Sequence, residues 1–543
     1  MKTYCKTIAA MVVILISIGR VYGITEISDI SQLRNYAGSV DGEQVSLLGY
    51  YSTTPGIGGG IFYRKTDTGG LTDNSGTIIK GAGNVFWLRE ERGYICVEDF
   101  GAISSSENDD SYASVNKTAF QNAVNYVSNC GGGSVTASGG VYFIAAWTSI
   151  GASNVTLCGN QSILKRPTAI NSQWLVIDGD SNFSMSGFTL DGNNSSVSYP
   201  TAACLCIYNN SKDIDISELT VINSKGIGIL LGANVENIRL NKITLGNCIN
   251  SCIFTGYTTA EINACNKILM SNIIVKDTSG SGITIGNNSR KVALTNSISD
   301  IGNNSYSAIE IKGAQDISIT NCIGRGGGYG LYIRNGGNTC KNISLSGNLW
   351  SDNYYDGVRA YGVYNISIVG DISKNNGDTY SGFCFLKEGS SLLCKNITLS
   401  SVQAFDDRST PLQDYGIRIA GADNILISSP SCHDNSTNIS YLPTDTRIYV
   451  SNDGANGATR KIKNVSTGSI SAGTTQTVDV QWDTPFVDSN LTCTATMFEG
   501  TSSRRLRVHH VSIIDSTKIQ VVVVNDDTNN AGSGVLHVSA ERN

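Results

Sequence analysis

Charge is scarce in this chain, and its balance is acidic. Lys, Arg, Asp and Glu make up 15% of the 543 residues, and the formal net charge is −6. A protein that binds nucleic acid needs a basic surface to neutralise phosphates. The composition therefore excludes nucleic acid as an expected partner.

Long apolar runs are also rare. The apolar stretch at residues 8–18 follows Lys2 and Lys6 and precedes the sequence Val21-Tyr22-Gly23. It is too short to span a bilayer, and this order is typical of a secretory signal peptide cleaved near Gly23. We therefore predict a signal peptide at residues 1–23 and a secreted, extracellular protein with no membrane association once that segment is removed.

Histidine is scarce, with four residues, and no pair of cysteines shows zinc-ligand spacing with a histidine nearby. No metal and no cofactor is expected. Of the 15 cysteines, Cys5 lies in the predicted signal peptide, and the other 14 would enter an oxidising compartment. Disulfide bonds are expected there, although sequence does not give their pairing. The alternative is that several cysteines stack as small apolar residues inside the fold.

Sequons of the form Asn-x-Ser/Thr are frequent, for example at Asn342, Asn365, Asn396 and Asn490. A eukaryotic source would make this a glycoprotein. The alternative is that Asn is favoured at regular bends and Ser or Thr follows on the solvent side. Regular placement of the sequons favours the alternative.

Glycine is abundant, with 59 residues, and it marks a repeat. A short strand led by a small residue, such as AIEIK, GLYIR or GVRAY, returns every 22 to 34 residues, and each follows a strand such as DISIT or NISLS. We place the starts of this first strand at Cys204, Gly226, Cys252, Gly282, Ala308, Gly330, Gly357, Gly382 and Gly416. Coils of this length with three short strands are typical of a parallel β-helix.

Three segments follow residues 1–23. Residues 24–95 are turn-rich around a helix at 27–36 and form a small N-terminal module, which is a neck or cap. Residues 96–445 are the β-helix, and its first coil is covered by a helix with apolar residues at 3–4 spacing: Phe120, Ala123, Val124 and Val127. Residues 446–543 change to longer alternating strands and predict a β-sandwich-like domain.

The sequences VEDFGA, NKTAFQNAVNYV and GGGSVTASGGVYFI, with an acidic pair between the first two, resemble the opening of the pectate-lyase-like superfamily. This superfamily includes rhamnogalacturonase-type enzymes and tailspike depolymerases. The order QVSLLGYY, GGGIFYRK, DNSGTII and FWLRE is similar to the neck of tailspike-type polysaccharide depolymerases. The resemblance implies a right-handed parallel β-helix of the pectin-lyase-like kind, a polysaccharide substrate and a homotrimer.

Alternation along the first strand points Ile309, Ile311, Leu331, Ile333 and Val358 inward. Equivalent outward positions then form columns along the β-helix. The central column is expected to contain Cys206, Gly228, Phe254, Thr284, Glu310, Tyr332, Arg359, Cys384 and Arg418. With the flanking columns, three consecutive coils gather charged and aromatic residues on one face: Glu310, Lys312, Tyr329, Tyr332, Arg334, Asp356, Arg359 and Tyr361.

This concentration of tyrosines and charges predicts a site for an acidic glycan, because aromatic rings hold sugars and cations hold carboxylates. A merely solvated face is the alternative. The catalytic candidates are Glu310, Lys312, Tyr332, Arg359 and Asp356. The substrate-binding candidates are Arg334, Tyr329, Tyr361 and Arg418.

Two mechanisms fit these residues. In β-elimination at a uronate, a cation neutralises the carboxylate while a base and an acid move protons, with Tyr332 or Lys312 as base or acid. In inverting hydrolysis, two carboxylates flank the bond, and Glu310 and Asp356 would lie about 9–10 Å apart on coils two steps apart. Elimination is slightly favoured, and a non-catalytic glycan-binding or adhesion protein is a hypothesis of another class.

The polygalacturonase branch of the resembled superfamily supplies a further comparison. SAIEIK is similar to its acidic-pair strand, but Tyr306 and Ser307 occupy the acidic positions. GGGYGLYI has Tyr329 for the histidine of that branch, and DGVRAYG keeps Arg359 but has Tyr361 for the lysine. Of the site residues of the polygalacturonase branch, the resemblance therefore assigns only Arg359 to this chain, and the carboxylates that carry out hydrolysis in that branch have no counterpart here.

Overall fold

The structure is a computed structural model. It describes residues 24–105, 109–151, 153–168, 172–193, 202–257, 265–389, 392–441, 446–451, 459–471, 474–481, 491–499, 506–515, 518–525 and 532–542. The predicted signal peptide and the sequon at Asn490 lie outside these residues. By their contacts, residues 1–167 with 185–188 form one compact unit, and residues 168–184 with 189–543 form another.

The N-terminal module is a five-stranded sheet in the order β1-β2-β3-β5-β4 with one short helix. Its elements are β1 (Thr25–Ile27), α2 (Ile30–Asn35), β2 (Gln44–Leu47), β3 (Gly60–Thr66), β4 (Ile78–Lys80) and β5 (Val85–Arg89). Helix α2 begins later than predicted because Ile27 belongs to β1, and the Asp29 side chain caps the helix by accepting from the Gln32 N–H. Leu33, Phe62 and Trp87 are fully buried in the core of the module.

A longer helix packs on the first parallel strands. The elements are β6 (Ile95–Cys96), the 3-10 helix η1 (Val97–Phe100), α3 (Ala113–Asn129), β7 (Gly133–Thr136), β8 (Val141–Phe143) and β9 (Val155–Lys165). The apolar face predicted for α3 is buried, including Phe120, Ala123 and Val124. This face contacts β7 and β8, so the helix shields apolar strand surface from water.

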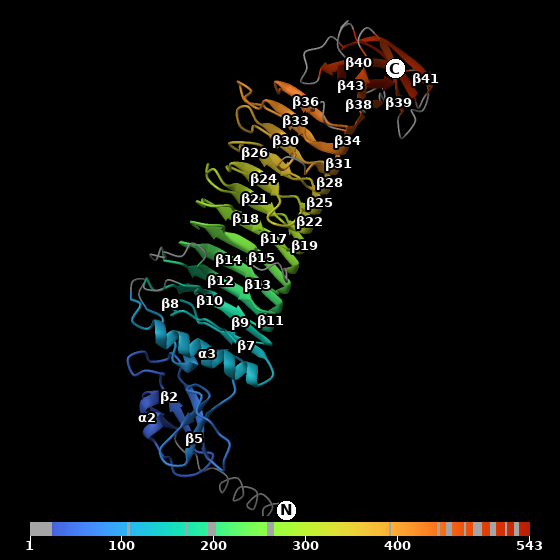
Figure 1. The fold of residues 1–543 in the computed structure, drawn as a ribbon. Coiled ribbons are helices and arrows are strands. Elements are labelled where there is room, and N and C mark those ends of the chain that lie inside the picture. The colour runs from blue at the N-terminus through green and yellow to red at the C-terminus, as the bar shows by residue number, and fades with distance from the viewer. Residues whose placement is uncertain are drawn as a thin grey trace, which may run out of the picture. The chain divides into compact units, whose positions relative to one another are not determined.

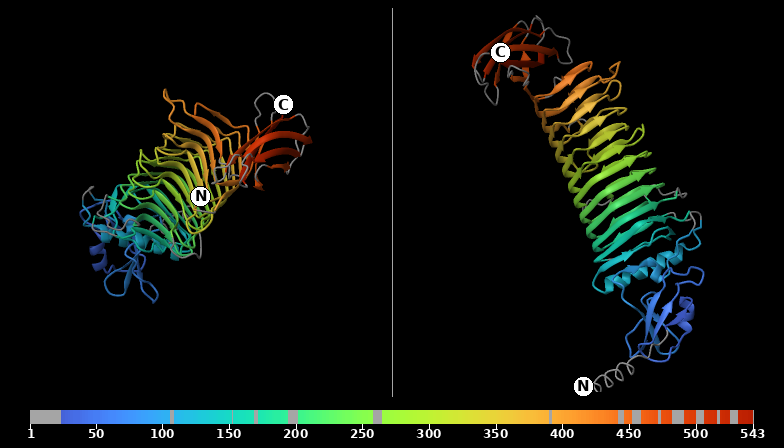
Figure 2. Two further views of the ribbon diagram at one scale, coloured as in Figure 1. Left: turned by 45° about the horizontal axis from the view of Figure 1, so that its top comes forward. Right: turned by 180° about the vertical axis from the view of Figure 1, so that it is seen from behind.

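The parallel β-helix expected from the repeat is confirmed (Figure 1). Its first face is an 11-stranded parallel sheet made of β10 (Leu175–Asp178), β12 (Ala203–Tyr208), β14 (Ile227–Gly232), β16 (Ile253–Tyr257), β18 (Ile283–Ile285), β21 (Ser307–Lys312), β24 (Tyr329–Arg334), β27 (Val358–Tyr361), β30 (Ser381–Leu386), β33 (Tyr415–Ala420) and β36 (Thr437–Tyr441). Seen from behind, the strands stack in the same order (Figure 2). Ile309, Leu331 and Val358 are buried, as predicted for the inward set.

The remaining strands of each coil form the other faces. The longer set is β11 (Ser181–Asp191), β13 (Lys212–Ile222), β15 (Glu236–Gly246), β17 (Asn266–Lys276), β19 (Arg290–Thr295), β22 (Gln315–Thr320), β25 (Lys341–Ser346), β28 (Tyr364–Val369), β31 (Cys394–Ser400), β34 (Ala422–Ser428) and β37 (Thr446–Ser451). The shorter set is β20 (Ile298–Asp300), β23 (Ile323–Arg325), β26 (Leu349–Ser351), β29 (Ile372–Lys374), β32 (Gln403–Phe405) and β35 (Ser431–His433). The 11-residue strand β17 pairs with both β19 and β20, so the coils from β18 to β35 have three strands, whereas in the preceding coils one long strand takes the place of the last two.

One register prediction is wrong. Cys206 pairs with Leu230, and Leu230 pairs with Phe254, so Leu230 and not Gly228 stands in the central column. The residue of this coil that is equivalent to Cys204 is therefore Gly228 rather than Gly226. A shift of two residues keeps the same side chains inward and outward, so the hydrophobic pattern does not distinguish the two registers. From Phe254 to Arg418 the pairs follow the predicted column.

The repeated glycines are required by close packing between coils. A Cβ atom on Gly330 would lie 2.6 Å from the carbonyl oxygen of Gly357, and one on Gly357 would lie 2.8 Å from that of Gly382. Both distances are shorter than a carbon and an oxygen tolerate. The repeated glycine is thus the position at which the backbone of the next coil comes too close for any side chain.

Asparagines at the bends form a second regular feature. Asn342, Asn365, Asn396 and Asn424 have positive φ between 56° and 61°, a conformation that Asn adopts more readily than most residues. Three of the side-chain amides donate to the asparagine of the preceding coil: Asn365 to Asn342 at 2.9 Å, Asn396 to Asn365 at 2.9 Å and Asn424 to Asn396 at 2.7 Å. The Asn342 amide donates to Asp316 at 2.8 Å. This geometry supports a structural role for the sequon asparagines Asn342, Asn365 and Asn396, and Asn424, which is in no sequon, has the same conformation.

The cysteines after Cys5 are free thiols in the structure, and most are buried. Cys265, Cys322 and Cys340, for example, are buried in the β-helix. This favours stacking as small apolar residues over the predicted disulfide bonds.

The C-terminal residues form two antiparallel sheets. The strands are β38 (Thr459–Ile470), β39 (Thr475–Gln481), β40 (Leu491–Glu499), β41 (Leu506–Asp515), β42 (Lys518–Asn525) and β43 (Gly532–Arg542). One sheet contains β38, β43 and β40, and the other has the order β39-β42-β41. Val480, Val521 and Leu536 pack in one core between them, as in a β-sandwich. Among the described residues, no helix is long and apolar enough to cross a membrane.

Candidate functional site

Three predicted site residues lie side by side on the first face of the β-helix. Glu310 of β21 pairs with Tyr332 of β24, which pairs with Arg359 of β27. Lys312 pairs with Arg334 in the neighbouring column. Residues that are 22 and 27 positions apart in sequence are thereby brought to strand spacing, about 4.8 Å.

Glu310 and Arg334 form an ion pair on this face. Nε and Nη2 of Arg334 lie 2.8 and 2.7 Å from the same oxygen, Oε1 of Glu310, whose side chain is 12% exposed. The guanidinium also lies over the Tyr332 ring, 5.4 Å from its centroid. The carboxylate, the cation and the phenol ring therefore form one cluster on two adjacent strands.

Asp356 is not presented to solvent. Its side chain is 0% exposed, and Arg359 Nε lies 2.5 Å from its Oδ2, an ion pair whose angles fall outside those of a hydrogen bond. Its Oδ1 accepts from the Ser381 N–H at 2.7 Å. Burial raises the pKa of Asp356, while Arg359 and Ser381 oppose that rise. A carboxylate enclosed in this way cannot flank a glycosidic bond together with Glu310.

Arg359 lies among tyrosine rings. Its guanidinium is 5.1 Å from the Tyr329 centroid, 5.9 Å from that of Tyr361 and 5.4 Å from that of Tyr380. Nη1 donates to the Tyr329 hydroxyl at 3.1 Å. These contacts indicate that Arg359 holds the tyrosine rings and Asp356 in position. Because its side chain is only 12% exposed, Arg359 offers little surface to a substrate.

The tyrosines form a continuous row of ring contacts. Tyr354 contacts Tyr355, Tyr355 contacts Tyr329, Tyr329 stacks on Tyr332 and Tyr332 meets Tyr361 edge-on, with centroids 4.9, 5.1, 4.7 and 6.0 Å apart. Burial raises the pKa of Tyr329 to about 12 and also raises that of Tyr332. Both phenols are therefore protonated at neutral pH and can donate a proton or a hydrogen bond.

Arg418 lies apart from this group. It is two strands beyond Arg359, with Cys384 between them, and its guanidinium is 5.0 Å from the Tyr415 ring centroid. The structure thus brings Glu310, Lys312, Tyr329, Tyr332, Arg334, Arg359 and Tyr361 together and leaves Arg418 outside.

A groove of about 880 Å³ adjoins the row of tyrosines and was not predicted from the sequence. Its lining includes Asn304, Ser305, Asp352, Tyr354, Asp378 and Tyr380. The residues come from four turns after the shorter strands, at 303–305, 352–355, 375–380 and 408–412. A sequence signal existed in the adjacent Tyr354-Tyr355 and in Tyr380, because aromatic residues in turns are often exposed for binding.

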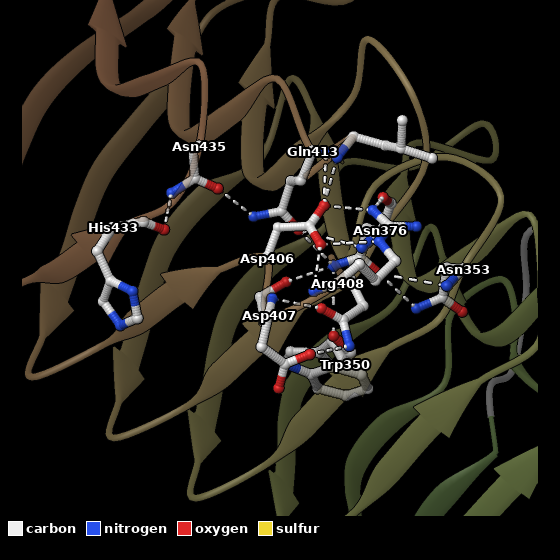
Figure 3. Close-up of polar contacts among 12 residues, drawn as sticks. Trp350, Asn353, Asn376, Asp406, Asp407, Arg408, Gln413, His433 and Asn435 are labelled. Atoms are coloured by element: carbon white, nitrogen blue, oxygen red, sulfur yellow. Dashed lines mark hydrogen bonds and ion pairs between the residues drawn. The ribbon is translucent and has the colours of Figure 1, made fainter. Parts of the chain in front are cut away.

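Buried amides support the floor of this groove (Figure 3). Asn353 Nδ2 donates to Asn376 Oδ1 at 2.9 Å, Asn376 Nδ2 donates to Gln413 Oε1 at 3.0 Å, and Gln413 Nε2 donates to Asn435 Oδ1 at 2.7 Å. Asn353, Asn376 and Gln413 are almost fully buried. Each amide satisfies its neighbour, so the turns above them are held in one arrangement.

Arg408 reaches the groove but is already paired. Its Nε donates to Asp406 Oδ1 at 2.8 Å, and its Nη2 donates to the Asn376 carbonyl at 2.6 Å. Although burial opposes it, Arg408 and the backbone N–H groups of Gln413 and Leu412 lower the pKa of Asp406 to about 2. The cation is therefore neutralised by a carboxylate that is charged at all ordinary pH values.

Comparisons with known proteins identify similar folds and one short sequence match. Residues 26–92 match the family model described as "Phage tail protein small four-stranded beta-sheet domain". The "Depolymerase, capsule K2-specific" of Klebsiella phage vB_KpnP_KpV74 is 32% identical over 100 residues, which are 18% of this chain and 17% of the relative. The match thus spans about one sixth of that relative's length.

Among solved structures, the enzymatically active domain of tailspike protein 2 of bacteriophage CBA120 is 13% identical with a TM-score of 0.52, covering 98% of this chain and 91% of that one. The fold is that of a tailspike β-helix. The A-module of the mannuronan C-5 epimerase AlgE6 of Azotobacter vinelandii is 17% identical with a TM-score of 0.53, covering 64% of this chain and 98% of that one. The tailspike-like layout expected from the sequence is thus confirmed for the fold.

Proposed function

We propose that this tailspike-like protein cleaves an acidic, uronate-containing polysaccharide at the face formed by Glu310, Lys312, Tyr332 and Arg334, by β-elimination. The observation that supports the proposal most directly is the register that sets a protonated phenol, Tyr332, between strands bearing cations. The likeness to a tailspike domain and the short match to a capsule depolymerase support a polysaccharide substrate.

The elimination divides into three tasks. Lys312 and Arg334 hold the uronate carboxylate and stabilise the charge that develops when the adjacent C5 proton is removed. The electron pair then forms the C4–C5 double bond as the C4–O bond breaks. Tyr332 protonates the leaving oxygen, which its raised pKa permits because the phenol still bears its proton at neutral pH. Glu310 is the neighbouring group that can accept the C5 proton, because Lys312 in its charged form has no free electron pair.

Hydrolysis by Glu310 and Asp356 is disfavoured by burial. Inverting hydrolysis needs two carboxylates with room for water between them, and Asp356 has no exposed surface. Elimination needs one base and one acid. The face therefore suits a lyase better than an inverting hydrolase.

The test is incubation of the purified protein with a panel of polyuronates and bacterial capsular polysaccharides. Ultraviolet absorbance reports unsaturated ends, and a reducing-sugar assay reports all chain cleavage. A rise in both supports elimination, whereas reducing ends without absorbance contradict it in favour of hydrolysis. Binding without either product contradicts the enzyme and favours an adhesion protein.

We also propose export directed by residues 1–23, as the sequence predicts, and assembly as a homotrimer, as the resemblance to tailspike depolymerases implies. N-terminal sequencing of the exported protein tests the first, and a start near residue 24 is expected. Sedimentation equilibrium tests the second, with a mass about three times that of the chain. A monomeric mass contradicts the trimer and leaves the proposed activity untouched.

A further inference from the structure

The groove beside the tyrosine row differs in charge from the face with Glu310. Asp352 and Asp378 line it, both are exposed, and neither carboxylate makes a hydrogen bond or an ion pair within the part of the chain that the structure describes. Arg408, the one cation that lines the groove among the described residues, forms an ion pair with the buried Asp406, and its hydrogen bonds to Asp406 and the charges of Asp406 and Asp352 raise its pKa. The groove is therefore net acidic, whereas the face bears Lys312 beside the Arg334–Glu310 pair.

The groove also offers an aromatic surface. Tyr354 is 71% exposed, which is unusual for a ring of this size, and it contacts Tyr355 edge-on at 4.9 Å. Tyr355 in turn contacts both Tyr380 and Tyr329, at 4.8 and 5.1 Å. An exposed aromatic ring with polar neighbours can stack on the apolar face of a sugar. The row of rings continues from the groove through Tyr329 to Tyr332.

We infer that the groove binds an uncharged sugar residue on Tyr354, with Asp352 and Asp378 accepting hydrogen bonds from its hydroxyls. A carboxylate accepts such bonds well, and it repels a uronate at the same place. The inference rests on the proposed function and narrows its substrate. The polymer is a heteropolysaccharide in which uncharged residues neighbour the uronate, because a chain lying along the tyrosine row meets cations at one end and carboxylates at the other.

The rigid floor supports selection of this kind. Asn353 both lines the groove and begins the row of buried amides that continues through Asn376 and Gln413. The turns are thus fixed before a sugar arrives, and binding need not order them. Because the turns are held in place, Asp352 and Asp378 stay at the groove when a sugar binds.

The experiment measures binding of trisaccharides to the full chain by NMR titration at low ionic strength. The probes are two uncharged trisaccharides, maltotriose and triacetylchitotriose, and the charged trigalacturonate. We expect at least one uncharged probe to bind, and Tyr354→Ala to weaken it about fivefold or more, while binding of trigalacturonate depends on Lys312 and is unchanged by Tyr354→Ala. Tyr94→Ala, which removes an exposed tyrosine of the N-terminal module, is the matched control.

A second variant tests the charge. Asp352→Asn combined with Asp378→Asn should weaken the uncharged probe and strengthen trigalacturonate about threefold, since repulsion is removed. The inference is overturned if neither uncharged probe binds, or if trigalacturonate loses affinity in Tyr354→Ala. Because these are binding measurements, a protein that binds as expected but cleaves no polymer contradicts only the proposed enzyme activity.

Discussion

Arg334 places both Nε and Nη2 on one oxygen of Glu310, which belongs to the preceding coil, at 2.8 and 2.7 Å. The second carboxylate oxygen of Glu310 is left for another donor. This arrangement makes Glu310 and Arg334 a unit: removing the arginine both subtracts a cation from the face and leaves a largely buried carboxylate without its partner.

We expect Arg334→Ala to raise KM for an acidic polymer about tenfold, since a hydrogen bond to a charged group contributes on the order of 1.5–3 kcal/mol. Arg334→Lys should restore part of the affinity, because it keeps the charge without the two-pronged contact. Steady-state kinetics on the substrate found in the panel measure both. An unchanged KM in Arg334→Ala would show that the uronate binds elsewhere.

Tyr332→Phe should lower kcat about 10²–10⁴-fold, the usual contribution of a general acid, while leaving the ring stacked on Tyr329. Because burial raises the pKa of Tyr332, the wild-type rate should not fall between about pH 7 and 9 through loss of its proton. Tyr364→Phe, on β28 and away from the site, is the control. Equal rates for Tyr332→Phe and wild type would exclude the phenol as the acid.

Asp356→Ala should destabilise the β-helix by about 3–5 kcal/mol, because it leaves the mostly buried Arg359 without its counter-ion. Asp215→Ala breaks the exposed pair with Arg239 and should change little. Thermal unfolding followed by circular dichroism compares the two. Similar midpoints for both variants would contradict a structural role for the Asp356–Arg359 pair.

Asp371 should make stability depend on pH. Burial raises its pKa to about 6, against the opposing hydrogen bonds from Asn348 and Trp350. A raised carboxyl pKa means that the folded state binds the proton more tightly, so this contribution is full below about pH 4 and is lost as pH rises through about 6. Its size is on the order of 2–3 kcal/mol.

The measurement is the thermal midpoint of wild type and Asp371→Asn between about pH 4 and 7. The midpoint of the wild type should fall relative to that of the variant as pH rises over this interval, because Asn does not titrate. Parallel curves for the two proteins would assign the pH dependence to other groups.

Gly357→Ala should lower the thermal midpoint strongly or prevent folding. The added Cβ would meet the Ser373 hydroxyl and lie 2.8 Å from the Gly382 carbonyl oxygen, so adjacent coils would have to separate. Gly246→Ala is the matched control, since the nearest atom to its Cβ is a carbonyl oxygen 3.7 Å away. If both variants unfold at the wild-type midpoint, close approach of the coils is not what requires glycine at position 357.

The sequence by itself determined the repeat, the three strands of a coil and which side chains point inward, because a strand alternates with period two whatever surrounds it. That is why Ile309, Leu331 and Val358 could be assigned to the core, and why Glu310, Tyr332 and Arg359 could be aligned from the repeat alone. The same period is why Gly226 and Gly228 could not be told apart.

Only the tertiary structure decided what each polar residue does. Asp356 and Glu310 are both carboxylates near the same strands, yet the Asp356 side chain has no exposed surface, whereas that of Glu310 is 12% exposed. The groove depends on how four turns, at 303–305, 352–355, 375–380 and 408–412, stack around the amides of Asn353 and Asn376. Burial and charge are properties of that stacking, and an alternating pattern along one strand contains no information about the turn above it.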